Sequence, residues 1–230
     1  MASAYGKSQS KDVLPTQELV DSLPIIGHLK SGAQYRILSM TMSTDEKLKP
    51  DAFIKLFNRP NLILHCSKML DQVIYDGDTY PFNQQMDIPG FKDYFLSHYA
   101  FLLIKSTPSE DSFTHDGFDD YSFWSENVLG MFYIKPNFPG RCSHICNGGF
   151  IVSVPARGQG VGSAMGLAYI DLAPKCGFKA SMFNLVFVNN IASVKLWQKL
   201  GFYEIGRIPK AGNLSSSSEL VDAIIFYKQF

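Results

Sequence analysis

Apolar and polar positions in the C-terminal third of the chain form blocks that switch between a strand period and a helix period. β-Branched and aromatic runs at 149–154 and 182–188 predict strands, and segments with helical spacing follow each of them, at 162–173 and 191–200. A strand, a helix and a second strand in this order predict a βαβ unit, and therefore one parallel pair within a mixed sheet. Closing strands are predicted at 202–208 and 220–226.

The blocks in the N-terminal part are shorter and less regular. Residues 1–18 are polar and predict a flexible tail, which leaves 19–230 as a single folded domain. The spacing predicts a short helix over 51–57 and a second helix over 61–75 with Asn61 as its N-cap. The remaining predictions are a helix over 91–98, strands over 35–42, 101–105 and 128–134, and an exposed excursion over 106–125.

Composition narrows the class of protein. Apolar residues make up 46% of the 230 positions, which is ample for a packed core. Lys plus Arg and Asp plus Glu both number 21, so the zero net charge argues against broad binding to nucleic acid or anionic membrane. The four cysteines are too few for a disulfide scaffold. We find no signal peptide or membrane span and expect a cytoplasmic protein, with the nucleus and mitochondrion left open.

The most informative segment is a glycine-rich loop between the strand at 149–154 and the helix at 162–173. It includes the run from Arg157 through Gly158, Gln159, Gly160, Val161 and Gly162 to Ser163. Alternating glycines allow successive backbone N–H groups to point at one spot, which is also the positive end of a helix dipole. The segment therefore predicts a phosphate-binding loop, and Arg157 adds a positive charge.

Two common phosphate motifs do not fit this loop. The Walker pattern requires Gly-Lys-Ser/Thr, but here Gly162 precedes Ser163 directly. The dinucleotide pattern requires a third glycine where Ser163 and Met165 stand. What fits is Arg-x-x-Gly-x-Gly, read from Arg157 to Gly162. This pattern resembles the coenzyme A pyrophosphate loop of the Gcn5-related N-acetyltransferase (GNAT) superfamily.

A second motif follows the next strand at the usual distance. Asn190, then Leu196-Trp197-Gln198-Lys199-Leu200-Gly201-Phe202, resembles the Asn … Leu-Tyr-x-Lys-x-Gly-Phe segment of the same superfamily. The segments at 132–137, 141–147, 183–188 and 221–225 look like those of the fungal proline-analogue N-acetyltransferases. Those enzymes acetylate L-azetidine-2-carboxylate and related imino acids.

The resemblance implies a fold, a reaction and a set of ligands. The fold is a mostly antiparallel mixed α/β sheet with a central, splayed parallel pair flanked by helices. The reaction is acetyl transfer from acetyl-CoA to the nitrogen of a small imino or amino acid. It also implies a homodimer, detoxification of proline analogues and oxidative-stress tolerance. The implied coenzyme contacts are Ile151, Val152, Arg157, Gly158, Gln159, Gly160, Val161, Gly162, Ser163 and Asn190.

Two asparagines are the candidate substrate contacts, since matching positions in the resembled family bind substrate. Asn147 precedes a predicted strand, where a turn or cap is the structural alternative. Asn184 interrupts an apolar strand, in which it is predicted to face the same way as Val186 and opposite to Phe183. Its amide must be hydrogen-bonded, either to backbone groups at the splay or to substrate.

The catalytic groups are less clear from sequence. Trp197 occupies a position where many relatives have a Tyr that serves as the general acid. An indole is no practical proton source, so we interpret Trp197 as a core residue. His144 is a weak candidate for the base, and no firm base is assigned. The Cys142-x-His144-x-Cys146 run is too crowded for a metal site. The alternatives are a protein or peptide N-acetyltransferase and a non-catalytic acyl-CoA sensor.

Overall fold

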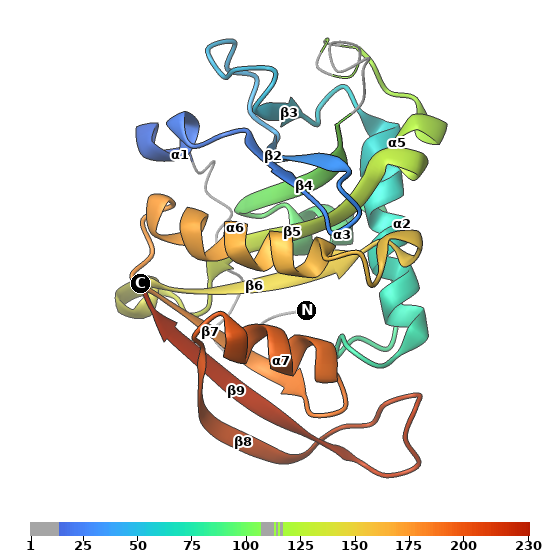
Figure 1. Ribbon diagram of the computed structural model, residues 1–230, viewed down its shortest axis with the longest axis vertical. Helices are drawn as coiled ribbons and strands as arrows, with labels where there is room; N and C mark the ends of the chain where they lie inside the picture. Colours follow the sequence, from blue (N-terminus) through green and yellow to red (C-terminus); the bar gives the residue numbers. More distant parts are fainter. Residues whose placement is uncertain (1–13, 107–112, 114, 116) are drawn as a thin grey trace.

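A single twisted sheet forms the centre of the molecule. The computed structural model describes residues 14–106, 113, 115 and 117–230 (Figure 1). The strand order is β1-β2-β4-β5-β6-β7-β9-β8, with β3 paired to β2. The strands are β1 (Ile25–His28), β2 (Gln34–Thr41), β3 (Phe53–Lys55), β4 (Tyr99–Lys105), β5 (Val128–Pro136), β6 (Ile145–Val152), β7 (Ala180–Phe187), β8 (Tyr203–Gly212) and β9 (Val221–Gln229).

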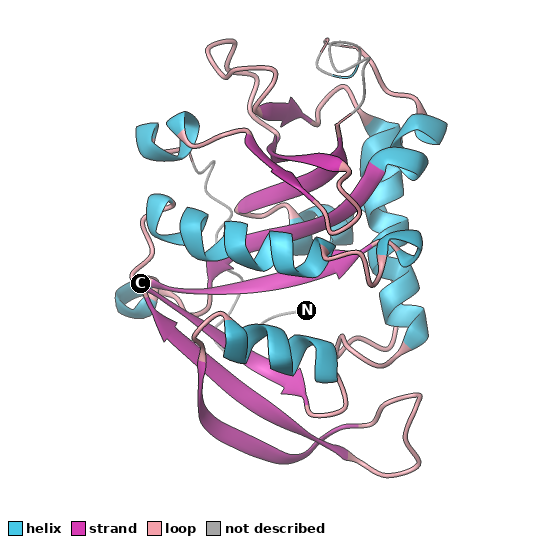
Figure 2. Cartoon of the chain, viewed as in Figure 1, coloured by secondary structure: helices cyan, strands magenta, loops and turns pink. Residues whose placement is uncertain are grey.

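Parallel pairing is confined to two places. β6 and β7 pair in parallel at the centre, β3 pairs in parallel with β2, and the other neighbours are antiparallel. Helix α6 crosses from β6 to β7 and supplies the predicted βαβ connection, as Figure 2 shows. The helices are α1 (Gln17–Asp21), α2 (Pro60–Asp76), α3 (Ile88–Phe95), α5 (Tyr121–Asn127), α6 (Val161–Lys175) and α7 (Ile191–Lys199). The mixed fold expected from the sequence is confirmed.

Each face of the sheet has its own apolar core. One core gathers α6 and α7 residues such as Tyr169 and Trp197 with Phe132 and Phe183 of the sheet. The other gathers α2, α3 and α5 residues such as Leu70, Phe95 and Trp124. Alternating side chains of β5 and β6 therefore point to opposite helical layers. None of the helices in the described part of the chain has the length and apolar character needed to cross a bilayer.

Two predictions in the N-terminal part are wrong. Residues 53–55 form a strand rather than a helix, because they pair with Ser39, Met40 and Thr41 of β2 and are buried throughout. Asn61 is not the cap of α2, since the helix begins at Pro60. The Asp119 carboxylate accepts from the backbone N–H groups of Asn61 (2.7 Å) and Leu62 (3.0 Å) instead.

The described residues of the predicted excursion at 106–125 include side chains that are more buried than expected. Trp124 and Phe113 are fully buried, and α5 packs on α2. Arg59, which precedes α2, donates to the Phe113 carbonyl (2.7 Å), and this bond holds Phe113 against the N-terminal end of α2. Residues 16–18, which were expected to belong to the tail, take part in α1: Thr16 caps this helix, and its hydroxyl donates to the Lys175 carbonyl. Residues 1–13, 107–112, 114 and 116 lie outside the described part of the chain.

Candidate active site

The two central parallel strands separate soon after they meet. β6 and β7 pair at Ile145↔Ala180 and Cys146↔Ser181, and their register extends no further (Figure 1). β7 also carries a bulge between Phe183 and Val186 where it runs along β9. The bulge places Phe183 and Val186 in the same core, so the predicted strict alternation around Asn184 is wrong. The separation of β6 from β7 agrees with the splayed parallel pair expected from the sequence.

Strand β6 directs part of its backbone into this widening gap. Asn137 N–H donates to the Ile145 carbonyl (2.8 Å) and Ser153 N–H donates to the Leu129 carbonyl (2.9 Å), which fixes the antiparallel ladder with β5. Because hydrogen-bonding direction alternates along a strand, the N–H groups of Phe150 and Val152 point toward β7. The N–H of Ile151 points to β5, so of the two predicted strand contacts Val152 has the better-placed donor.

The glycine loop has the geometry of an anion site. Gly158 and Gly160 have φ angles of 77° and 94°, a region that side chains disfavour. Gly160 is the N-cap of α6 and offers no side-chain cap, so the N–H groups of Val161, Gly162 and Ser163 remain available at the helix terminus. The Gln159 amide folds back onto the Pro155 carbonyl (2.8 Å) and braces the loop. A pyrophosphate fits this cradle of N–H donors.

Two cations flank the loop. Arg157 lies 3.5 Å from Asp76 of α2 and is half exposed. Lys30, in the turn after β1, extends its aliphatic stem beside Gly160, and its backbone N–H reaches the Gln159 carbonyl (3.4 Å). Sequence analysis missed Lys30, because only folding brings the β1–β2 turn to the loop. Its position adds positive charge where an anionic ligand would lie.

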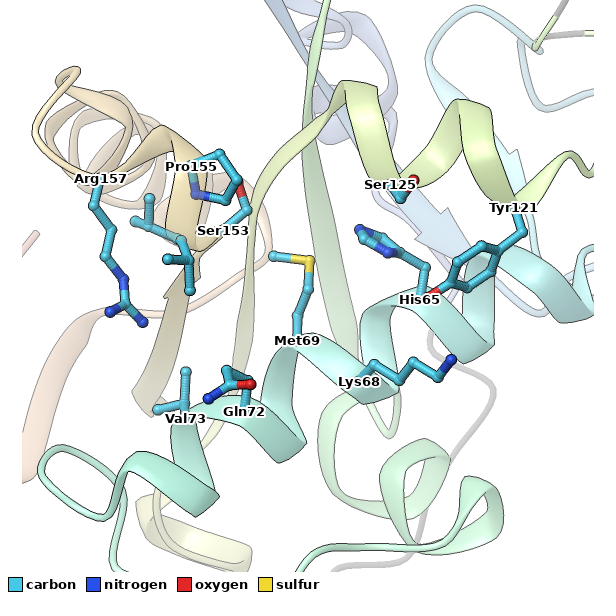
Figure 3. Close-up of a pocket in the computed structure, with 12 residues that line it drawn as sticks. His65, Lys68, Met69, Gln72, Val73, Tyr121, Ser125, Ser153, Pro155 and Arg157 are labelled. Atoms are coloured by element: carbon cyan, nitrogen blue, oxygen red, sulfur yellow. The ribbon is translucent and has the colours of Figure 1, made fainter. Parts of the chain in front are cut away.

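A groove of about 220 Å³ opens next to this loop (Figure 3). One wall is the segment from Val152 to Arg157, and the other is formed by α2 and α5. Lys68 and Arg157 line it from different elements. His65 lies inside, where burial and the charge of Lys68 lower its pKa. The groove therefore extends the cationic surroundings of the loop.

Three asparagine amides meet at the start of the splay. Asn137 and Asn184 exchange two hydrogen bonds, from Asn137 Nδ2 to Asn184 Oδ1 (2.9 Å) and from Asn184 Nδ2 to Asn137 Oδ1 (2.6 Å). Asn147 Nδ2 also donates to Asn137 Oδ1 (3.2 Å), and its own Oδ1 accepts from Gly148 N–H (2.7 Å). The structure thus brings both predicted substrate asparagines together through Asn137, which sequence analysis did not single out as a site residue.

Aromatic hydroxyls and a lysine lie on the same face of the sheet. Lys135 is the register partner of Asn147, and its Nζ lies over the rings of Tyr94 (4.0 Å) and Tyr133 (4.2 Å). The ammonium donates to the Tyr94 carbonyl (2.8 Å), and burial lowers its pKa to about 8. No ion pair joins Lys135 to a carboxylate in the described part of the chain. We call these residues, with Asn137, Asn147, Asn184 and Tyr80, the acceptor face.

The other predicted residues have structural roles or remote positions. Trp197 is buried against Phe150 and Phe183, with ring centroids at 4.8 and 4.5 Å, so its core role is confirmed. Asn190 caps α7 through Ser193 N–H (3.2 Å), as predicted. His144 is exposed in the turn before β6, about 20 Å along the strand from Phe150. It is therefore poorly placed to act as a base at the gap.

The Cys-x-His-x-Cys run does not converge. Cys142 is exposed, whereas Cys146 is buried with its Sγ 3.2 Å from the Tyr169 hydroxyl. Within the described residues no group of three or more His, Cys, Asp or Glu side chains is arranged to hold a metal. Cys146 instead belongs to the core beneath the paired end of β6 and β7.

The chain matches one family model and known proteins of similar sequence. The Acetyltransferase (GNAT) family model matches residues 84–202, just over half of the chain. N-acetyltransferase aca1 of Schizosaccharomyces pombe is 40% identical over 173 residues, which are 75% of this chain and 82% of that protein. Protein SPT10 of Saccharomyces cerevisiae is 35% identical over 107 residues, 46% of this chain but 17% of SPT10.

Solved structures agree with the sequence comparison. A Gcn5-related N-acetyltransferase from Kribbella flavida superposes with a TM-score of 0.62 at 25% identity, covering 75% of this chain and 94% of that one. The protein yncA of Salmonella typhimurium, solved with acetyl-CoA, has the same fold with a TM-score of 0.56 at 14% identity, covering 73% of this chain and 89% of yncA. Family match, sequence relative and fold together show that this chain belongs to the GNAT family of acetyltransferases.

Proposed function

We propose that this acetyltransferase moves the acetyl group of acetyl-CoA to the secondary amine of a small cyclic imino acid such as L-azetidine-2-carboxylate. The observation that carries the proposal is the triple amide cluster of Asn137, Asn147 and Asn184 at the start of the splay. Each amide keeps donor or acceptor capacity beyond these bonds. Such a cluster suits a small polar acceptor held next to the thioester.

The charge of the acceptor face supports a substrate that carries a carboxylate. Lys135 is largely buried beside Asn147, and no carboxylate of the described residues pairs with it. A substrate carboxylate would supply the missing counter-charge. A peptide amine or lysine would bring a positive charge instead, to a face without an acidic side chain. This contrast favours a free imino acid over a protein substrate.

The coenzyme contacts that we propose are the glycine loop and the exposed donors of β6. Pyrophosphate would lie on the N–H groups of Val161, Gly162 and Ser163, with Arg157 and Lys30 nearby. Gly158, Gln159 and Gly160 shape the loop, and Val152 offers its N–H to the pantetheine arm. The side chain of Ile151 packs in the core that β6 shares with α2, α3 and α5. Asn190 caps the N-terminus of α7 through its amide oxygen, and this bond does not use its amide nitrogen.

The chemistry needs little beyond positioning. The neutral amine attacks the thioester carbonyl, the C–N bond forms, the C–S bond breaks, and the ammonium proton leaves to water while the thiolate is protonated. The N–H of Phe150 points into the gap, where it can stabilise the oxyanion. The physiological consequence would be detoxification of proline analogues.

A substrate panel tests the proposal. We would measure N-acetylation of L-azetidine-2-carboxylate, of azetidine, which lacks the carboxylate, and of a short peptide with a free N-terminus. We expect kcat/KM to be highest for the imino acid and at least about tenfold lower for azetidine, since losing one charged hydrogen bond costs 1.4 kcal/mol or more. Preferred acetylation of the peptide would refute the imino-acid assignment, and coenzyme binding without any turnover would indicate a sensor.

We also propose that the chain forms a homodimer through strand β8. This strand is the edge of the sheet, and its residues Tyr203, Ile205 and Ile208 are exposed. An exposed apolar edge strand favours pairing with a second chain. Sedimentation of the wild type and of Ile205→Lys tests this: we expect a dimer that the substitution converts to monomer, and a wild-type monomer would refute it.

A further inference from the structure

The hydroxyl of Tyr80 is buried without a hydrogen-bond partner. Tyr80 lies in the loop between α2 and α3, where its ring stacks near Phe82 with centroids 6.3 Å apart. Tyr80 as a whole is partly exposed, but its Oη atom is shielded from solvent, and among the described residues no donor or acceptor reaches it. A buried polar group without a partner is unfavourable, and a catalytic role is one reason for which such a group is retained.

The position of this hydroxyl is specific. A Cβ atom built on Gly149 would lie 2.6 Å from Tyr80 Oη and 2.5 Å from the ring of Tyr133. Tyr80 Oη therefore lies directly over the backbone of Gly149, and glycine is required there for the approach. Gly149 is the residue of β6 that immediately precedes Phe150, and both lie beyond Cys146, the last residue of β6 that pairs with β7.

Neighbouring hydroxyls do not share this freedom. Tyr94 and Tyr133 hydrogen-bond to each other at 3.0 Å, so each has its partner within the protein. Tyr169, on the other face of the sheet, bonds Ser181 (2.7 Å). Among the described tyrosines around the gap, Tyr80 is the one whose buried hydroxyl has no hydrogen-bond partner. The Tyr80 hydroxyl lies on one face of β6 over Gly149, and the N–H of the next residue, Phe150, leaves the edge of the same strand.

We propose that Tyr80 is a catalytic residue whose hydroxyl donates a hydrogen bond to the thioester carbonyl of acetyl-CoA and, with the Phe150 N–H, forms the oxyanion hole. As the amine nitrogen attacks, the carbonyl π electrons move to oxygen, and both donors stabilise that charge. When the C–S bond breaks, the carbonyl re-forms and the electron pair leaves with sulfur. Tyr80 keeps its proton throughout. It therefore supplies a hydroxyl to the reaction, although Trp197 stands where relatives have a tyrosine, and it does so without acting as an acid.

The environment suits a donor that stays neutral. Burial, and then the neighbouring Tyr94, raise the pKa of Tyr80 well above its usual value. Phenolate formation is therefore suppressed at the pH values where the amine substrate reacts. A neutral hydroxyl of this kind strengthens its bond as negative charge develops on the carbonyl oxygen.

Infrared difference spectroscopy of bound [1-¹³C]acetyl-CoA tests the proposal without any acceptor. The full chain, Tyr80→Phe and the exposed-site control Tyr75→Phe would be compared. We expect the labelled carbonyl band at lower frequency in the wild type and in Tyr75→Phe than in Tyr80→Phe. In turnover, we expect kcat of Tyr80→Phe to fall by roughly a hundredfold, with KM for acetyl-CoA changed by less than about threefold.

Each other outcome overturns the proposal. An identical carbonyl band, or a kcat of Tyr80→Phe close to that of the wild type, would show that the hydroxyl does not contact the thioester. A clear loss of Tm in Tyr80→Phe would show that the hydroxyl has a partner in the free protein. Calorimetry measures whether each variant binds acetyl-CoA, and the carbonyl band is compared only among variants that do. A failure of the coenzyme assignment would appear as lost binding and is therefore distinguished from a failure of the Tyr80 proposal.

Discussion

Asn137 and Asn184 exchange two amide hydrogen bonds, of 2.9 and 2.6 Å, across the point where the central strands separate. Asn137 follows β5 directly and Asn184 lies in the bulge of β7, so the pair links strands that have no backbone pairing with each other. The link fixes the width of the gap at its narrow end. We therefore expect local stability, and the substrate binding proposed above, to depend on the same two side chains.

A double-mutant cycle on this pair tests the link. We expect Asn137→Ala and Asn184→Ala each to lower the free energy of unfolding, because each removes the two hydrogen bonds that join these partly buried amides. The double variant should lose less than the sum, with a coupling energy of about 1 kcal/mol or more. Urea unfolding measures it, and the exposed Asn189→Ala serves as control. Strict additivity of the two losses would contradict the link.

Substitution at Gly162 tests the coenzyme loop without backbone strain. A Cβ atom there meets nothing closer than 3.9 Å, unlike at Gly160, where φ is 94°. Gly162→Asp adds a carboxylate at the N-terminus of α6, which suits the free helix but repels pyrophosphate. We expect Tm to hold and the Kd for acetyl-CoA to rise at least about tenfold, as expected for one unfavourable charge contact.

The neutral variant Gly162→Asn is the matched control for that experiment. It has nearly the same volume without the charge, so its Kd should rise much less. Calorimetric titration with acetyl-CoA measures all three proteins. Equal affinities for the wild type and Gly162→Asp would mean that the pyrophosphate lies elsewhere.

The lowered pKa of Lys135 predicts how carboxylate binding depends on pH. Tetrahydrofuran-2-carboxylate mimics the imino acid but has no amine that titrates. Since Lys135 has a pKa of about 8, it is charged below that pH and neutral above it. Affinity for this inhibitor should therefore be full below pH 8 and fall as the pH rises beyond it, by at most about tenfold per pH unit.

Lys135→Met removes the titrating group while keeping most of the side-chain volume. We expect weak inhibitor binding that no longer changes between pH 7 and 10. Inhibition constants measured across that range check both statements. A wild-type affinity that stays flat through pH 8 would show that Lys135 does not bind the carboxylate.

Trp197→Phe distinguishes packing from catalysis in α7. Trp197 is 4% exposed and packs against Phe150, Phe183 and Phe202. The smaller ring leaves a cavity, so we expect a lower Tm, with an unfolding loss of roughly 1–3 kcal/mol. Turnover of the folded variant should stay within about threefold of the wild type, because the indole N–H is not a practical proton source and has no assigned role as a general acid. A thousandfold loss with an intact fold would implicate the indole N–H.

The C-terminal elements could be predicted from sequence because their signals are local. Gly201 illustrates this: it has φ of 77°, and the Phe202 N–H bonds the Trp197 carbonyl (2.9 Å), which ends α7 as the Leu-Gly-Phe run indicates. The glycine loop is equally local, since its conformation depends on Gly158 and Gly160 themselves.

The failures all involve partners far apart in the chain. β3 is a strand because β2 pairs with it, and nothing within residues 51–57 indicates that partner. The N-terminus of α2 is capped by Asp119, which is 58 residues from Asn61. Asn137 and Lys30 join the site through tertiary contacts in the same way, and their residue types alone do not distinguish them from ordinary surface residues.

Steady-state kinetics of Asn184→Ala with L-azetidine-2-carboxylate and acetyl-CoA test the central claim most directly. The claim is that the amide cluster holds a small imino acid while the glycine loop holds the coenzyme. It predicts N-acetylated product from the wild type and a kcat/KM for the imino acid at least about tenfold lower in Asn184→Ala, with KM for acetyl-CoA near normal. An unaltered kcat/KM for the imino acid in a variant with a lower Tm would contradict it.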